Sequence, residues 1–375
     1  MTVQTPATTP LLQREGSWLA KSMKANPGDT HHLPILAEAE KRFYGAMGLE
    51  EFYEKLIKFI DNKIEPVQGE PLSLDQLRKV DTFTRDYFIG KLPEVETWIV
   101  RGFVLGKLLE TRERTAPPHP KIDLDKLPAK VREAAKEYKL TLRETRAIEW
   151  AESYGAKNLS NATNDTINRV QNVLFDNVKQ HLGPRSLRKA LEAEFMEDEF
   201  EINRNWRRVA NTETNAAYNQ GYLAQIPPGE WVMGFSNPDA CYHCKRLIDG
   251  KVYQVIDVAG KNMSYDDSKN PEALQWLWEN TVWLGKDNFG RSGAEQKRTP
   301  TGLVDREHHE KYMPTLPLHP HEHCRWVRIS PQTQYVNSKG EMRMRVMDEE
   351  AWKAWYSASI KPIEGKLGMM LKEAT

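Results

Sequence analysis

The chain has few cysteines, no long apolar run and no excess of charge of either sign. Three cysteines among 375 residues cannot form a closed disulfide framework. The most apolar stretch, residues 98–109, is interrupted by Arg101 and Lys107 and is too short to span a bilayer, so we expect no membrane contact. Lysine plus arginine and aspartate plus glutamate both number 53, which argues against a strongly basic nucleic-acid-binding protein.

The N-terminus also lacks the order of basic, apolar and small residues that marks a secretory signal. We therefore expect synthesis in a reducing cytoplasm, where closely spaced thiols bind a metal more often than they form a bridge.

The first half of the sequence has the periodicity of helices. Residues 1–32 are polar and aperiodic, which predicts a flexible arm. Over 33–115 apolar residues recur three and four apart, as in Val95, Ile99 and Phe103, so this helical region should pack one stripe into a core. The prolines within 116–122 predict an extended linker.

A second helical region should cover 123–228. The sequence from Thr141 to Glu144 fits a capping box at a helix start. Further on, the apolar positions of residues 166–182 fall on one helix face, and a long helix should follow over about 199–225.

Beyond residue 228 the sequence pattern becomes that of a small domain with both strands and helices. Residues 229–330 contain short β-prone runs around loops, and 331–375 read as a hairpin followed by a short helix. The predicted fold class is therefore α+β, with a mainly helical N-terminal region and a small domain that a zinc knuckle stabilises.

All three cysteines can be explained by one zinc site. Cys241 and Cys244 have the spacing at which a tight turn brings two thiolates to one ion, and His321 and Cys324 repeat that spacing. We expect these four residues to hold a structural Zn²⁺. His319 is the alternative fourth ligand, whereas two other histidines are less suitable. They are His323, which adjoins a cysteine, and His243, whose ring should point outward from the knuckle.

Three segments in order resemble the phage Mu F-like head morphogenesis family, also called minor head proteins. The resemblance covers about 205–330, and the loop from Gly285 to Arg291 also resembles one found in that family. The matching residues are Thr212, Glu213, Asn219 and Gly221 in a helix, Asp239, Cys241, Cys244, Asp249, Gly250 and Lys251 at the knuckle, and His319, Pro320, Cys324 and Arg325 at the closing element.

The resemblance implies a phage minor capsid protein that acts structurally, without catalysis or a small-molecule substrate. Such a protein would associate with the portal and other head proteins, enter the procapsid and virion, and serve assembly and DNA packaging. Two departures concern the closing element: Trp326 stands where the family often has a last cysteine, and the pair His319–Pro320 lies two residues further from Cys324.

Catalytic and DNA-binding alternatives rest on other residues. Asp305, His308 and His309 could bind a metal and activate water, as in an HNH-like nuclease, although no Asn–His partner follows at a suitable spacing. A zinc deaminase is disfavoured because the order of its motifs is reversed here. Weak contact with packaged DNA would use a small basic group around the knuckle: Lys245, Arg246, Lys251, Arg325 and Arg328.

Glu213 needs its own interpretation, because an acidic residue in mid-helix can be a general base. No nucleophile or second carboxylate accompanies it in the sequence. We therefore expect a structural role, either in a helix pair with Arg207 or Arg208 or in a contact with the zinc domain.

Overall fold

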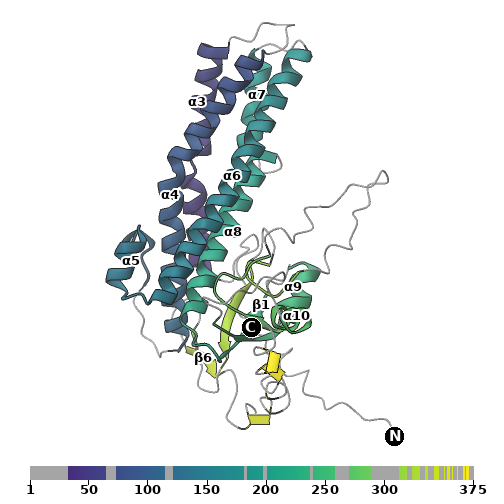
Figure 1. The fold of residues 1–375 in the computed structure, drawn as a ribbon. Helices are drawn as coiled ribbons and strands as arrows, with labels where there is room; N and C mark the ends of the chain where they lie inside the picture. Colours follow the sequence, from purple (N-terminus) through teal and green to yellow (C-terminus); the bar gives the residue numbers. More distant parts are fainter. Residues whose placement is uncertain are drawn as a thin grey trace.

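The computed structural model describes a helical bundle with a small sheet at one end (Figure 1). The described residues are 33–64, 73–114, 121–180, 184–196, 201–236, 240–257, 270–288, 312–318, 323–329, 334–336 and 342–345, with a few isolated positions after 349. The arm predicted for residues 1–32 lies outside them. The architecture is α+β and mostly helical, as the sequence predicted.

Three long helices form the bundle: α4 (Leu74–Arg114), α6 (Leu142–Lys179) and α8 (Glu201–Ala224). Shorter helices pack on them, namely α2 (Pro34–Ala46), α3 (Leu49–Phe59) with the π-helical turn η1 (Ile60–Ile64), and α7 (Pro184–Met196). With 41 residues, α4 is roughly 60 Å long, and Pro93 lies within it. A side lobe holds the 3₁₀ turn η2 (Leu124–Lys126) and α5 (Val131–Glu137).

The apolar stripe predicted for residues 95–103 is buried, since Val95, Ile99 and Phe103 are all at most 1 % exposed. The two helical regions on either side of the Pro-rich segment do not form separate cores. Apolar residues from 43 to 99 and from 151 to 217 share one cluster, which includes stacked Phe88 and Trp206 with ring centroids 4.3 Å apart. Thus α8 lies in the middle of the bundle and connects it to the sheet.

Helices α4 and α8 cross at glycine residues that lie on both helices. A Cβ atom added to Gly221 would lie 1.9 Å from the Phe103 carbonyl oxygen, and one added to Gly106 would lie 2.0 Å from that of Tyr218. Gly102 faces Ala217 in the same crossing. Only residues without a side chain let the two backbones approach this closely, so these positions fix how α8 is placed.

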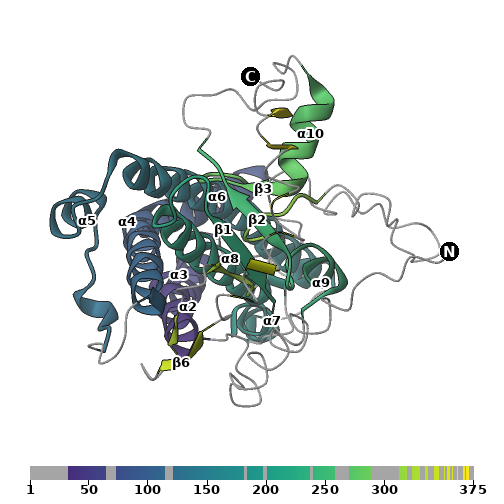
Figure 2. The ribbon, with the colours of Figure 1, turned by 90° about the horizontal axis from the view of Figure 1, so that it is seen from below.

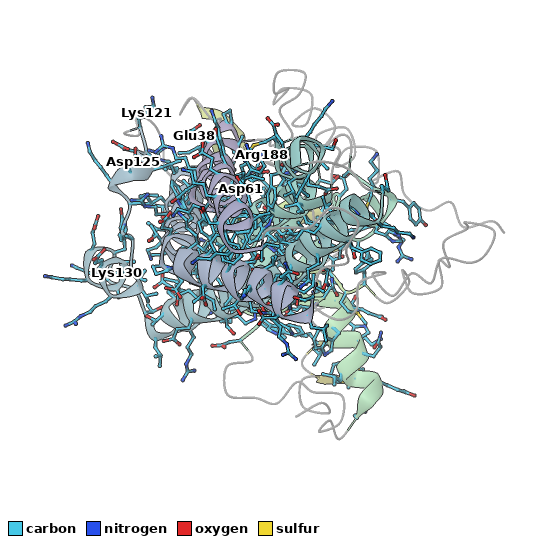
Figure 3. All side chains as sticks on the ribbon, turned by 90° about the horizontal axis from the view of Figure 1, so that it is seen from above. Glu38, Asp61, Lys121, Asp125, Lys130 and Arg188 are labelled. Carbon is cyan, nitrogen blue, oxygen red and sulfur yellow. The ribbon has the colours of Figure 1, made fainter. Side chains whose placement is uncertain are left out.

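Several ion pairs lie on the surface of the bundle. Seen from its far end, Arg188 of α7 pairs with Asp61 of η1 (Figure 3). Arg42 of α2 pairs with Glu38 at 2.6 Å and with Asp125 of the side lobe at 2.5 Å. All these side chains are about a third or more exposed, so each pair contributes little to stability.

The small sheet has the order β3-β2-β1-β4 and is mixed. Its strands are β1 (Trp231–Phe235), β2 (Val252–Val255), β3 (Thr281–Val282) and β4 (Arg325–Ile329). Strand β1 pairs antiparallel with β2 and β4, while β2 and β3 are parallel. Helix α9 (Tyr242–Leu247) follows β1, and α10 (Pro271–Asn280) precedes β3; Figure 2 shows α10 and α5 on different sides of the bundle end.

The sequence predicted β1, β2 and β4 correctly, but the parallel pairing of β3 was not expected. The C-terminal hairpin is also confirmed: β5 (Gln334–Val336) pairs antiparallel with β6 (Met342–Arg345). The turn at 337–340 lies outside the described residues, as does most of the short helix predicted after residue 349.

Candidate functional site

The segments that carry the family resemblance meet where α8 touches the sheet. Strand β1 ends beside the start of β4, since Phe235 and Arg325 are paired. The Cys241–Cys244 segment follows β1 and Cys324 immediately precedes β4, so both cysteine segments leave the sheet at the same end. Cys244 and Cys324 also belong to one apolar cluster together with residues of α8.

Helix α8 binds the outer edge of β4 through side chains. Asn219 accepts a hydrogen bond from the Trp326 amide (3.1 Å) and donates one to the Cys324 carbonyl (3.2 Å). One turn away on either side, Asn215 donates to the same carbonyl (3.2 Å) and the Tyr222 hydroxyl accepts from the Arg328 amide (2.9 Å). The free edge of β4 thus forms its hydrogen bonds with side chains of α8 instead of with another strand. This pairing explains why α8 contains buried Asn side chains.

The three thiols differ in exposure. Cys241 is the exposed N-cap residue of α9, whereas Cys244 is 2 % and Cys324 1 % exposed. His243 is half-buried, with its ring centroid 5.6 Å from that of Tyr312. Among the described residues no group of three or more His, Cys, Asp or Glu side chains is arranged to hold a metal ion. His319 and His321 lie outside those residues, as do Asp305, His308 and His309.

The described part of the loop that resembles the family, Gly285 to Asn288, forms hydrogen bonds with several neighbouring segments. The Gly285 amide donates to Gln220 of α8 (3.0 Å), and buried Lys286 donates to the carbonyls of Trp278 and Thr281 (2.5 and 2.7 Å). Asn288 donates to the Met313 carbonyl (2.8 Å) and accepts from the Met313 amide (3.0 Å). These contacts attach residues 312–318, and with them the approach to β4, to the rest of the domain.

Glu213 is buried at the centre of the bundle. It accepts a 2.6 Å hydrogen bond from Asn158 of α6, and a Cβ atom on Gly155 would lie 3.0 Å from its other oxygen. Burial raises the pKa of Glu213 from 4.5 to about 8, and the Asn158 hydrogen bond only partly offsets that rise. The predicted partners were wrong: its contact is with α6, because its helix face turns away from the arginines and from the sheet.

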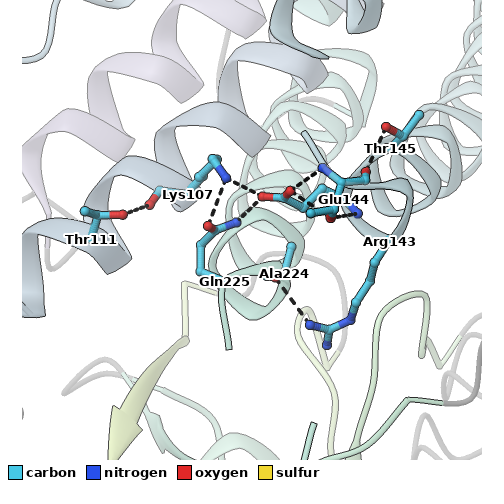
Figure 4. A network of polar contacts seen from close by, with 8 residues as sticks. Lys107, Thr111, Arg143, Glu144, Thr145, Ala224 and Gln225 are labelled. Carbon is cyan, nitrogen blue, oxygen red and sulfur yellow. Dashed lines mark hydrogen bonds and ion pairs between the residues drawn. The ribbon is translucent and has the colours of Figure 1, made fainter. Parts of the chain in front are cut away.

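A second buried carboxylate secures the C-terminal end of α8. Glu144 accepts from the Thr141 amide at 2.6 Å and the Glu144 amide donates to the Thr141 hydroxyl at 3.2 Å, which confirms the predicted capping box. Glu144 also pairs with Lys107 of α4 and accepts from Gln225 at 2.6 Å (Figure 4). Burial alone would raise the pKa of Glu144, but these hydrogen bonds lower it overall.

The basic group predicted to contact DNA divides into two. Lys245, Arg246 and Lys251 are exposed. Arg325, however, is 1 % exposed with its guanidinium 5.6 Å from the Phe235 ring, and Arg328 pairs with Glu110 at 3.2 Å and with Glu230. These two arginines stabilise the sheet and its contact with α4, so their proposed phosphate contact was wrong.

Sequence reasoning missed Asn158 and Gln220, whose roles depend on helix packing that no local pattern reveals. The Asn and Gln side chains of the long helix predicted over about 199–225 gave one signal, because polar side chains on a helix that packs in a core need buried partners. Within the described residues, no helix combines the length and apolar character needed to cross a membrane. Comparisons with protein-family models, curated proteins and solved structures found no match.

Proposed function

We propose that this chain is a structural minor head protein of the phage Mu F-like type, associated with the portal and present in the procapsid and virion. The proposal rests on three motifs in the family's order, at Asn219 in the helix, Cys241 and Cys244 at the knuckle, and Cys324 before the closing strand. In this role the protein serves assembly and DNA packaging and needs no catalysis.

The observation that carries the proposal is how the motif residues are used. Asn219 forms hydrogen bonds with the backbone beside and in β4, Gly221 packs against the backbone of α4, and Lys286 and Asn288 donate to backbone carbonyls. Each of these positions supports the fold, which is what a structural protein requires of its motif. A bundle whose longest helix spans roughly 60 Å also offers a long lateral surface for neighbouring head proteins.

Zinc bound by Cys241, Cys244, Cys324 and His321 is part of the proposal. The thiols suit such an ion because both cysteine segments leave the same end of the sheet and two of the thiols lie in one buried cluster. A bound Zn²⁺ would join the segment after β1 to the segment before β4, which are separated by about 80 residues. Metal ligation then adds to the folding free energy of a sheet with short strands.

Head association is tested with the cognate portal and with purified particles. The tagged chain should co-purify with portal protein, and mass spectrometry should detect it in procapsids and virions. Absence from both particles would refute the proposal. Replacing His308 and His309 with alanine should leave phage yield near that of wild type, whereas a large loss of yield with metal-dependent DNA cleavage in vitro would favour the nuclease.

Zinc content is tested by elemental analysis of protein purified without chelator. We expect about one thiol-bound zinc per chain, lost or much weakened in Cys241→Ser, Cys244→Ser and Cys324→Ser. His321→Ala should behave like the cysteine variants, with His319→Ala as the matched control. If His319→Ala loses the metal and His321→Ala keeps it, the fourth ligand is His319.

A further inference from the structure

Helix α9 presents a tyrosine and two cationic side chains to solvent. Its inward side carries Cys244 and, just after the helix, Ile248, which are 2 % and 0 % exposed. On the opposite side Tyr242, Lys245 and Arg246 are exposed, and because the two cations lie three and four positions after the tyrosine, all three share one helix face. Figure 2 shows α9 at the side of the bundle end away from α5.

The Tyr242 ring is supported by its own helix and is open to solvent. Its exposed fraction is 69 %. The Arg246 guanidinium lies over the ring, 5.9 Å from its centroid, and the His243 ring lies edge-on to it with the centroids 5.5 Å apart. His243 in turn lies beside Tyr312. The ring is thus oriented by α9 itself, while most of its surface stays accessible to a partner.

The cations of this surface lack acidic partners. Exposed cations on the long helices commonly pair with a carboxylate four residues away. Within the described part of the chain, Lys245, Arg246 and Lys251 form no ion pair, and α9 itself contains no acidic residue. The carboxylate of Asp249 accepts a hydrogen bond from the Ser236 amide at 3.4 Å. Three unpaired cations in one short segment favour an anionic partner, because binding it removes their mutual repulsion.

A single-stranded nucleic acid matches both features of this surface. Its phosphates suit the cations, and its unpaired bases expose flat faces that stack on an aromatic ring or on an arginine. A duplex supplies the phosphates but buries the faces of its bases, and an acidic peptide supplies charge without flat rings. The whole chain has a net charge of zero, so such binding would come from this local surface and not from a general attraction.

We propose that α9, together with Lys251, is a binding surface for single-stranded nucleic acid. Tyr242 and Arg246 stack on bases, while Lys245 and Lys251 bind phosphates. Zinc bound by the thiols leaves this face open, since Cys244 lies on the inward side of the helix. The proposal concerns a surface of the isolated chain and does not rest on a role in the phage head.

Fluorescence anisotropy of the full chain with a labelled oligothymidylate of about 15 nucleotides measures the binding. We expect Tyr242→Ala to bind at least about fivefold more weakly with an unchanged dependence on salt, because stacking involves no counterion release. Tyr242→Phe keeps the ring and should bind like wild type. Lys245→Gln combined with Lys251→Gln should reduce the slope of log affinity against log salt concentration by about 1.4, since each phosphate contact on a single strand contributes about 0.7.

A variant with the same change of charge provides the control. Lys58→Gln combined with Lys63→Gln removes two exposed cations from α3 and η1, at the far end of the bundle, and should change neither the affinity nor the slope. All these variants should keep the zinc content and the urea unfolding midpoint of wild type, because each substituted side chain is exposed.

Three results would overturn the proposal. The first is no binding of the oligonucleotide at about 100 µM protein in low salt, where even weak non-specific binding is detected. The second is a Tyr242→Ala variant that folds like wild type and binds equally tightly, which would leave attraction by charge alone. The third is binding of a duplex as tight as that of the single strand, or displacement by polyglutamate as effective as by unlabelled oligothymidylate, since either would mean that bases are not recognised.

Discussion

Replacing Glu213 with glutamine should stabilise the protein, and by more at high pH than at low pH. The carboxyl group is fully buried and has one hydrogen-bond donor, Asn158 at 2.6 Å. Because its folded-state pKa is raised to about 8, the folded protein binds more protons than the unfolded chain between pH 4.5 and 8. Stability contributed by this group is therefore fully present below pH 4.5 and is lost as the pH rises to about 8.

The size of the effect follows from the shift. A rise of the pKa of Glu213 from 4.5 to about 8 is about 3.5 units, which at 1.36 kcal/mol per unit is roughly 5 kcal/mol. At pH 7, which is 2.5 units above the ordinary value, roughly 3 kcal/mol of this loss has occurred. Glutamine has the same shape and stays neutral, so Glu213→Gln should gain under about 1 kcal/mol at pH 5, about 3 at pH 7 and about 5 at pH 9.

Urea unfolding followed by circular dichroism at these three pH values measures the difference between wild type and variant. Glu144→Gln is the matched control, because Glu144 is also a buried helix residue but its pKa is lowered by Gln225, Lys107 and Thr141. It should be destabilised at pH 7, and its deficit should shrink as the pH falls through the folded-state pKa of Glu144. If the difference in unfolding free energy between Glu213→Gln and wild type stayed constant from pH 5 to 9, the idea that Glu213 is buried as a neutral carboxyl group would be refuted.

Two further predictions concern the contacts of α8. Asn219→Leu should destabilise the fold by about 2–4 kcal/mol in urea unfolding, because it leaves the buried Trp326 amide without its partner; a cost below 0.5 kcal/mol would contradict this role. Gly221→Ala should cost more than about 3 kcal/mol or prevent folding, since its Cβ would meet the carbonyl of Phe103 at 1.9 Å. Gly45→Ala, in a helix with open space around it, should be neutral or slightly stabilising in the same urea unfolding experiment.

The elements were largely predictable from the sequence because they follow from local patterns. The apolar stripe of α4, the capping box of Thr141 and Glu144 and the short β-prone runs each identified their element. Strand β3 escaped because it has two residues, Thr281 and Val282, and forms only by pairing with β2. A strand of two residues is too short to show a periodic pattern, so local sequence could not predict it.

The candidate site was less predictable, because its contacts join distant segments. Nothing near Glu213 in the sequence indicates Asn158, which lies 55 residues earlier and meets it only through the crossing of α6 and α8. Arg325 and Arg328 looked like exposed basic residues, yet both face the interior of the molecule or its acidic partners. Charge alone does not reveal exposure, because a strand in a small sheet can turn an arginine toward an aromatic ring or a buried carboxylate.

Helix α8 accounts for why motifs so far apart in the sequence form one unit. Its C-terminal half forms hydrogen bonds with β4 through Asn219, and Gly221 lets α4 approach its backbone closely. One buried polar helix therefore sets the position of the closing strand relative to the long bundle. A Zn²⁺ ion bound by the thiols would add to that same junction, since Cys324 directly precedes β4. Loss of that ion should therefore loosen the junction between sheet and bundle before it affects the far end, where α3 and α7 make their own aromatic contacts, such as Phe52 with Phe195 at 5.3 Å.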